Sequence, residues 1–221
     1  MICIENYIYH LIEELQEQFA SRLLYVGLQG SYVRGEATED SDIDIMVVVD
    51  ALDVTDLDQY RATIASMEFF EKSCGFICGK SDLMNWNPLE LHHLLYSTKD
   101  YYGILRELVP EYSEENIRDF VKLSVGNLYH EICHRYVHSV NNADISRLSQ
   151  NYKSVFYILQ NLFYLSSGEF ISTKTDLLNR LDGKNYAVLK RSMDMNAGIL
   201  FDFSDSFELL FKWCQKILML G

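Results

Sequence analysis

The stretch Leu28–Asp50, LQGSYVRGEATEDSDIDIMVVVD, holds a Gly-Ser turn, an Arg-Gly pair and two alternating aspartates. Asp42 and Asp44 lie at the start of an apolar run that continues to Val49, which predicts a buried strand with both carboxylates at its leading end. Residues two apart on a strand project from the same face, about 6.6 Å apart. Two such carboxylates repel each other unless a cation lies between them, and a hard divalent ion with oxygen ligands suits the pair.

A second feature precedes the aspartates. The residues Leu23–Gln29 form an apolar run that predicts another strand, and this strand leads into Gly30 and Ser31. Backbone N–H groups and a hydroxyl would then face the same place as the carboxylates, and such groups hold phosphate in proteins. The stretch therefore predicts a site for a metal ion and a phosphate.

Two other interpretations of the stretch fail. The glycine spacing of Gly30–Gly35 is that of a P-loop, but Glu36-Ala37 occupies the place of the required Lys and Ser or Thr. The spacing of Asp40, Asp42 and Asp44 resembles the start of a calcium-binding loop. However, Ile45 stands in place of the loop's glycine and Ala51 in place of its bidentate glutamate. A polar surface turn before a core strand stays open as the simplest alternative.

The residues Gly30-Ser31, Arg34-Gly35 and Ser41-Asp42-Ile43-Asp44 together resemble the signature of the nucleotidyltransferase superfamily, which includes minimal and aminoglycoside nucleotidyltransferases. The resemblance implies that Gly30 and Ser31, with Arg34 and Ser41, bind the triphosphate of ATP or another NTP. It also implies that Asp42 and Asp44 hold Mg²⁺, with two ions expected, and that a third acidic residue comes from a later strand.

Asp82 is our prediction for that third residue. It lies in a predicted strand, Phe76–Asn85, one helix after the aspartate pair, so we expect it to act as a catalytic and metal-binding carboxylate with Asp42 and Asp44. Glu90 is the alternative. Lys80 could face a phosphate from the same strand, although a single lysine is more often solvated.

Composition limits the class of protein. The chain has 221 residues, 48% of them hydrophobic, and a net charge of −13. Nucleic acids are bound through Lys and Arg, so this charge argues against stable nucleic-acid binding and suits a cationic acceptor. No apolar run is long enough for a membrane span or fits a signal peptide, and five cysteines without a framework spacing fit reduced thiols. We therefore expect a cytoplasmic protein without a membrane partner.

The periodicity of the chain changes at Pro110. Before it, two strands, a third predicted strand and amphipathic helices such as Asn6–Phe19 predict a small mixed sheet covered by helices, followed by a broken helix over Leu89–Leu108. After it, every segment has helical spacing. The prediction is an α+β protein with a nucleotidyltransferase domain at 1–109 and an all-α helical bundle at 110–221.

The bundle should consist of five helices. The first begins at Ser113 and ends at a break over Asn141–Ser146, and the others cover about 148–163, 173–181, 184–195 and 204–218. By architecture alone, the bundle is similar to the substrate-binding domains of nucleotidyltransferases. Lys153, on its second helix, is our candidate for a further contact with the triphosphate, with a surface lysine as the alternative.

One motif in the bundle supports a different function. His130-Glu131-Ile132-Cys133-His134 matches H-E-x-x-H, which places two zinc ligands and a general base on one face of a helix. In the extended zinc-peptidase motif a glycine and a histidine follow, but Val137 and Val140 stand there. A zinc peptidase is thus the less favoured alternative.

The resemblance implies a metal-dependent nucleotidyltransferase that moves a nucleoside monophosphate from an NTP, ATP first, to a hydroxyl of an acceptor. A small molecule such as an aminoglycoside-like antibiotic is the favoured acceptor. The alternatives are a protein- or RNA-directed enzyme of the minimal nucleotidyltransferase antitoxin type and a binding module without turnover. The oligomeric state is open, a homodimer included.

Overall fold

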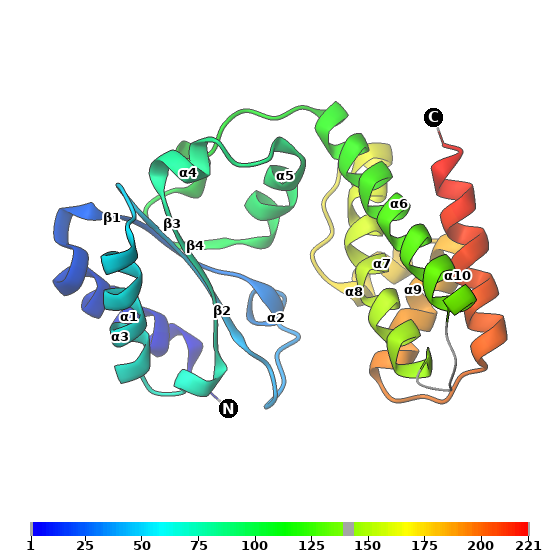
Figure 1. Cartoon of the computed structure of the whole chain (residues 1–221), viewed down its shortest axis with the longest axis horizontal. Helices are drawn as coiled ribbons and strands as arrows, with labels where there is room; N and C mark the ends of the chain where they lie inside the picture. The colour runs from blue at the N-terminus through cyan, green and yellow to red at the C-terminus, as the bar shows by residue number, and fades with distance from the viewer. Residues whose placement is uncertain (1, 139–143, 221) are drawn as a thin grey trace. The chain divides into compact units, whose positions relative to one another are not determined.

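The computed structural model of the chain describes residues 2–138 and 144–220. The chain divides into two units, Met1–Tyr112 and Ser113–Gly221 (Figure 1), and the sequence placed the boundary three residues earlier. Within the described residues, no helix combines the length and the apolar character that crossing a membrane requires.

The first unit is built on a four-stranded sheet with the order β3-β2-β1-β4. Its strands are β1 (Leu23–Leu28), β2 (Ile43–Val49), β3 (Ser73–Gly79) and β4 (Lys99–Tyr102). β1 pairs antiparallel with β2 and β4, whereas β2 and β3 are parallel. Parallel neighbours need a crossover, and α3 (Val54–Ser66) provides it.

Helices cover both faces of this sheet (Figure 1). α1 (Ile4–Phe19) and α3 pack on the face that receives Ile43, Ile45 and Val47 of β2. α4 (Lys80–Met84) and α5 (Pro88–Ser97) lie on the other face, where the alternate residues Met46 and Val48 are buried. Since strand side chains alternate between faces, Asp44 belongs to the face of α4 and α5.

Two segments differ from the sequence-based expectation. The third strand begins at Ser73 and ends at Gly79, so it is three residues earlier than predicted at its start and six at its end. The segment predicted as a broken helix contains α5, the strand β4 and a short 3-10 helix at Leu105–Glu107. β4 pairs with β1 through Val26, Gly27 and Leu28, and this pairing makes it part of the sheet.

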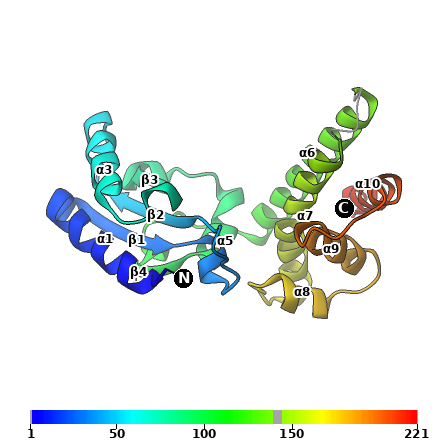
Figure 2. The ribbon, with the colours of Figure 1, turned by 90° about the horizontal axis from the view of Figure 1, so that it is seen from below.

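The second unit is entirely helical within its described residues. It contains α6 (Glu114–His138), α7 (Asp144–Ser167), α8 (Lys174–Arg180), α9 (Gly183–Asn196) and α10 (Phe203–Leu218). α6 packs against α7 and α10, and α9 packs against the same two helices (Figures 1 and 2). The predicted break at Asn141–Ser146 falls partly on residues 139–143, outside the described residues.

Trp213 and Tyr152 anchor the core of this unit, and both are fully buried. Their polar atoms are satisfied: the Trp213 indole donates to Asn185, and the Tyr152 hydroxyl donates to the Ser206 carbonyl. Burying such rings with their polar ends paired stabilises a bundle without leaving an unsatisfied donor. The mixed sheet followed by this bundle confirms the predicted α+β fold.

Candidate active site

Asp42 and Asp44 lie at the beginning of β2, at the edge of the face that α4 and α5 cover. Asp42 is exposed immediately before the strand, and Asp44 is half-buried as its second residue. The Gln29 N–H donates to the Asp44 carbonyl at 2.8 Å, which holds the end of β1 beside the pair. Gly30, the first residue of the short helix α2 (Gly30–Val33), thus lies against the Asp44 carboxylate, and Ser31 follows it in the helix.

Gly30 approaches Asp44 more closely than any other residue type could. Its φ is 71°, in the left-handed region that favours glycine, and a Cβ there would lie 2.0 Å from the Asp44 Oδ2 atom. A side chain at position 30 would therefore displace the carboxylate. The glycine turn is needed to bring backbone and carboxylate together.

Asp44 is a half-buried carboxylate with a second negative charge nearby. Desolvation by burial raises its pKa, and the negative charge of Asp42 raises it further. A hydrogen bond from Cys74 and the positive charge of Arg34 act in the opposite direction but do not cancel the rise. A cation between the two carboxylates would relieve this strain.

Cys74 is the residue that the sequence analysis missed. It is the register partner of Asp44 across the parallel β2–β3 pair, and its thiol donates a hydrogen bond to the Asp44 carboxylate. Desolvation and the charges of Asp44 and Asp42 raise the pKa of this thiol, which keeps it protonated as a donor. The neighbouring Gly75 allows the close approach, because a Cβ there would lie 1.9 Å from the Ile45 carbonyl oxygen.

Asp82 does not join this group, and the prediction of a third carboxylate at this position is wrong. It follows β3 as the third residue of α4, and its carboxylate accepts a hydrogen bond from the Gly79 N–H at 3.0 Å. Gly79 pairs with Val49, five residues along β2 from Asp44, which is about 16 Å at the rise of a strand. Asp82 caps a helix at the opposite end of the sheet.

The other charged candidates near Asp82 have different surroundings. Glu90 lies in the first turn of α5, and its carboxylate accepts a hydrogen bond from the Trp86 indole at 2.8 Å. Trp86 stacks on Phe76, two residues after Cys74, so Glu90 is on the same face of the sheet as Asp44. Lys80 is exposed at the start of α4, at the far end of the sheet with Asp82.

The two remaining motif residues, Ser41 and Arg34, belong to the segment between β1 and β2. Ser41 closes a turn with Thr38, since its N–H donates to the Thr38 carbonyl at 3.1 Å and its Oγ accepts from the Thr38 N–H at 2.8 Å. Arg34 donates to Glu36 at 2.9 Å, and its charge also acts on Asp44 and on His93 of α5. Arg34 is thus the cationic side chain beside the carboxylates.

The donor set suits Mg²⁺ that is held partly by a substrate. Among the described residues, no group of three His, Cys, Asp or Glu side chains is gathered to hold a metal ion. Mg²⁺ commonly takes one or two carboxylates and completes its octahedral shell with water and substrate phosphates. Asp42 and Asp44 can supply that share, and Gly30 at the start of α2 adjoins Asp44.

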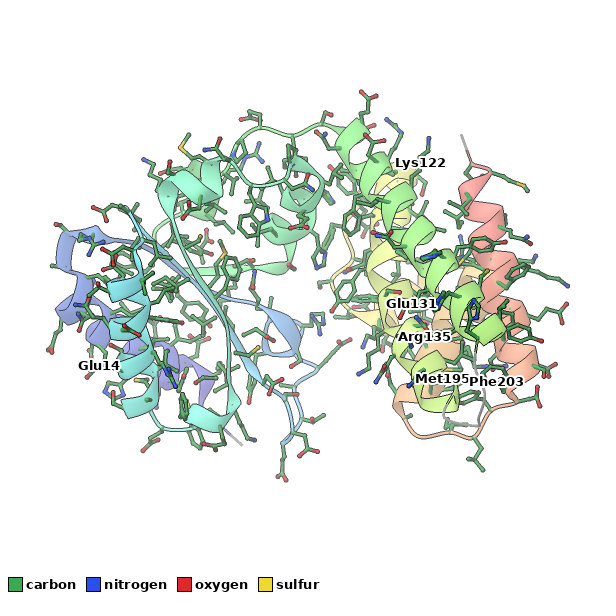
Figure 3. All side chains as sticks on the ribbon, in the orientation of Figure 1. Glu14, Lys122, Glu131, Arg135, Met195 and Phe203 are labelled. Atoms are coloured by element: carbon green, nitrogen blue, oxygen red, sulfur yellow. The ribbon has the colours of Figure 1, made fainter. Side chains whose placement is uncertain are left out.

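Two predictions concern the helical unit. Lys153 is an exposed residue of α7, and its role as a nucleotide contact stays a prediction. His130 and His134 are exposed on α6, and Glu131 forms an ion pair with Arg135 one turn later (Figure 3). Glu131 is therefore held by a cation on its own helix, and no third ligand gathers with the histidines among the described residues.

Comparisons with known proteins agree with the geometry of the first unit. Residues 8–102 match the sequence model of the nucleotidyltransferase domain. The protein adenylyltransferase MntA of Thermococcus cleftensis is 60% identical over 35 residues, which are 16% of this chain and 33% of that protein. The chain thus matches only a third of the length of this relative. The resemblance to nucleotidyltransferases is confirmed for this domain.

Among solved structures, spectinomycin adenyltransferase AAD(9) from Enterococcus faecialis, with ATP and spectinomycin, is similar over 95% of this chain and 98% of that one. The TM-score is 0.56 and the identity 16%, so the likeness concerns the fold. A toxin–antitoxin structure with AMP-PNP is 21% identical over 58% of this chain and 92% of that one, with a TM-score of 0.33 that is too low to support a conclusion.

Proposed function

Because residues 8–102 form a nucleotidyltransferase domain, we propose that the protein transfers AMP from ATP to a hydroxyl group of a small acceptor molecule. The observation that carries the proposal is that Gly30, at the start of α2, lies against the Asp44 carboxylate, since this joins a candidate phosphate-binding segment to candidate metal ligands. The fold likeness to AAD(9) extends over both units, which favours a small acceptor. We also expect the protein to act in the cytoplasm.

The reaction requires one bond to form and one to break. The acceptor oxygen attacks the α-phosphorus, the bond to the β-phosphate oxygen breaks, and pyrophosphate leaves. Asp42 and Asp44 would hold Mg²⁺, which neutralises charge on the phosphates when bound. Gly30 and Ser31 would hold the β- and γ-phosphates, with Arg34 beside them. Most of the rate would then come from positioning and electrostatic stabilisation.

The proton of the acceptor hydroxyl must also leave. Asp82 is at the far end of the sheet and cannot accept it there. Glu90, on the same face as Asp44, is the side chain of this unit that we propose for that role. A Glu90→Gln variant should then lower kcat more than it changes KM for ATP, because it affects the chemical step.

A second candidate is the adenylylation of a protein. The segment of 35 residues that is 60% identical to the protein adenylyltransferase MntA supports it, although it covers a small part of each chain. The two candidates share the nucleotide site and differ in the acceptor. The identity of the molecule that receives the AMP therefore distinguishes the two candidates.

The test uses α-labelled ATP and Mg²⁺ with three kinds of acceptor: aminoglycosides and aminocyclitols including spectinomycin, a protein lysate, and RNA. We expect labelled small molecules. Asp42→Asn and Asp44→Asn should each reduce transfer at least about 100-fold, because each removes a metal ligand. Asp82→Asn is the matched control and should keep transfer within about threefold. Labelled protein instead would favour the second candidate, and transfer that survives the double Asp42→Asn, Asp44→Asn change would contradict both.

A further inference from the structure

A cavity of about 440 Å³ lies in the first unit beside the loop that leads to Asp42. One wall consists of Thr38, Glu39 and Asp40 from that loop, and Tyr32, the residue after Ser31, forms another. The third wall is Phe69, next to the 3-10 helix η2 (Phe70–Lys72). Residues from both motif segments thus line the cavity, which is the size of a site for a small molecule.

The lining combines two aromatic rings with two carboxylates. Tyr32 is half-buried, Phe69 is 38% exposed, and Glu39 and Asp40 are exposed at the rim. Aromatic faces attract cations through the ring quadrupole, and carboxylates attract them through charge. The chemistry that this combination recognises is a positively charged amine with an apolar or ring-shaped body.

The single cation of the lining is already engaged. The Lys72 ammonium donates a hydrogen bond to the Glu39 carbonyl oxygen, which ties η2 to the motif loop. This bond to a neutral carbonyl leaves the positive charge of Lys72 in place, and the two carboxylates of Glu39 and Asp40 outnumber it in the lining.

Backbone strain at Phe69 is consistent with a ring that is held in place. Its φ is 61° and its ψ is 32°, the left-handed region that side chains other than glycine rarely adopt. Such strain persists where the surroundings determine the conformation. Here the Lys72 N–H donates to the Phe69 carbonyl at 2.8 Å, which closes the turn that presents the ring.

The charge of the unit favours the same ligand. Residues 1–112 contain 20 of the 32 acidic and 7 of the 19 basic residues of the chain, so the whole net charge of −13 lies in this unit. A field of this sign raises the local concentration of cations and accelerates their association. An anionic ligand would meet the opposite effect.

We propose that this cavity binds the protonated amine of a small cationic ligand, and that this ligand is the acceptor. The second part rests on the proposed function, whereas the binding site does not. Tyr32 follows Ser31 and Asp40 precedes Asp42 by two residues, so both segments of the nucleotidyltransferase motif contribute to the lining of the cavity. The amine is a binding group, and a hydroxyl elsewhere on the acceptor receives the AMP.

The test measures binding without nucleotide or metal. The protein, labelled with ¹⁵N, is titrated with 1,6-diaminohexane and, in parallel, with the uncharged 1,6-hexanediol. The backbone amide shifts of Thr38, Glu39 and Asp40 should saturate with the diamine and not with the diol. The double variant Glu39→Gln, Asp40→Asn should weaken binding at least about fivefold, as should Phe69→Leu.

Two control variants keep the outcome interpretable. Glu71→Gln removes a charge from the neighbouring segment outside the cavity lining and should leave diamine binding unchanged. Asp44→Asn should also leave it unchanged although transfer is lost, so this site and the nucleotide site fail separately. Equal shifts with the diol, or unchanged binding in the double variant, would overturn the proposal. With an amine-bearing acceptor, the double variant should raise KM and leave kcat within about twofold.

Discussion

The two ends of the β2–β3 strand pair carry the same residue type with opposite surroundings. At the end where β2 finishes, Asp56 accepts hydrogen bonds of 2.8 Å from both terminal nitrogens of Arg22, and the same guanidinium reaches Asp50 at 3.0 Å. Asp82 accepts from Gly79 at 3.0 Å. At the other end, Asp42 and Asp44 lie two residues apart, and the negative charge of Asp42 acts on Asp44.

The pKa values of Asp56 and Asp44 are shifted in opposite directions by these surroundings. Hydrogen bonds from Arg22 lower the pKa of Asp56, whereas burial and the charge of Asp42 raise the pKa of Asp44. A carboxylate that accepts hydrogen bonds from a cation stabilises the fold. A carboxylate that is repelled by a second carboxylate can gain stability by binding a cationic ligand. Hydrogen-bond and charge partners therefore distinguish the structural aspartates of this sheet from the pair that we propose to be functional.

The largest difference in thermal stability should appear between two variants that each neutralise one carboxylate, one at each end of the strand pair. Asp56→Asn removes the charge that Arg22 binds and disturbs the capping box with Asp53, so we expect the Tm to fall by several degrees. Asp44→Asn removes a repelled charge, so the Tm should stay constant or rise. Thermal unfolding at neutral pH without divalent ions measures both, and a fall in Tm for both variants would remove the distinction.

Cys74 allows the second test, because it already lies beside Asp44. Cys74→Asp should add a third carboxylate to the repelling end, which lowers the Tm without metal and increases the stabilisation that Mg²⁺ provides. Cys74→Ser keeps a hydrogen-bond donor and should behave as the wild type. A Cys74→Asp protein whose Tm does not respond to Mg²⁺ would show that no ion binds at this position.

A smaller effect should appear with pH on the α5 side of the sheet. Burial lowers the pKa of His92 to about 4, and its Nδ1 atom is 3.1 Å from the Tyr112 hydroxyl. In the unfolded chain a histidine has a pKa of about 6.5. Below that pH the unfolded chain binds a proton that the folded protein does not bind, so stability falls until about pH 4. The loss should be on the order of 1–3 kcal/mol over this range.

Urea unfolding between pH 7 and pH 4.5 measures that loss. His92→Gln should flatten the pH dependence, whereas His10→Gln, which changes an exposed histidine of α1, should leave it as in the wild type. A pH dependence that is identical in all three proteins would contradict the assignment to His92. His93, whose pKa burial and Arg34 also lower to about 4, would add to the residual slope of His92→Gln.

The smallest effect should come from the H-E-x-x-H motif. His130 and His134 are exposed on α6, so changing both to Ala should alter stability by less than about 0.5 kcal/mol and release no metal. Elemental analysis of untagged protein, before and after the change, checks this. Near-stoichiometric zinc that disappears in the double variant would favour the zinc peptidase instead.

The strand pattern of the site could be predicted from the sequence because its signals are local. Two apolar runs predicted the strands that became β1 and β2, whereas the predicted Gly-Ser turn is the beginning of the short helix α2. The position of Cys74 beside Asp44 could not be predicted from the local sequence. Cys74 stands second in β3 as Asp44 stands second in β2, but the register of a parallel pair is set by tertiary packing.

The errors at Asp82 and β4 have similar causes. The apolar residues Leu83 and Met84 follow Asp82 and suggested a continued strand, although Gly79 is the cap of α4 and ends β3. β4 has the sequence Lys-Asp-Tyr-Tyr, a short and polar edge strand whose pairing with β1 decides its structure. Local propensity is weak in such a segment, and the neighbouring strand supplies the missing information.

The most direct test of the central claim is Mg²⁺-dependent ATP binding, measured by calorimetry with two double variants of equal charge. Asp42→Asn, Asp44→Asn changes one end of the strand pair, and Asp50→Asn, Asp82→Asn changes the other. We predict that the first variant binds ATP at least about tenfold more weakly in the presence of Mg²⁺ and that the second binds as the wild type does. Equal ATP affinities in the two variants, or a loss confined to the second, would contradict the account.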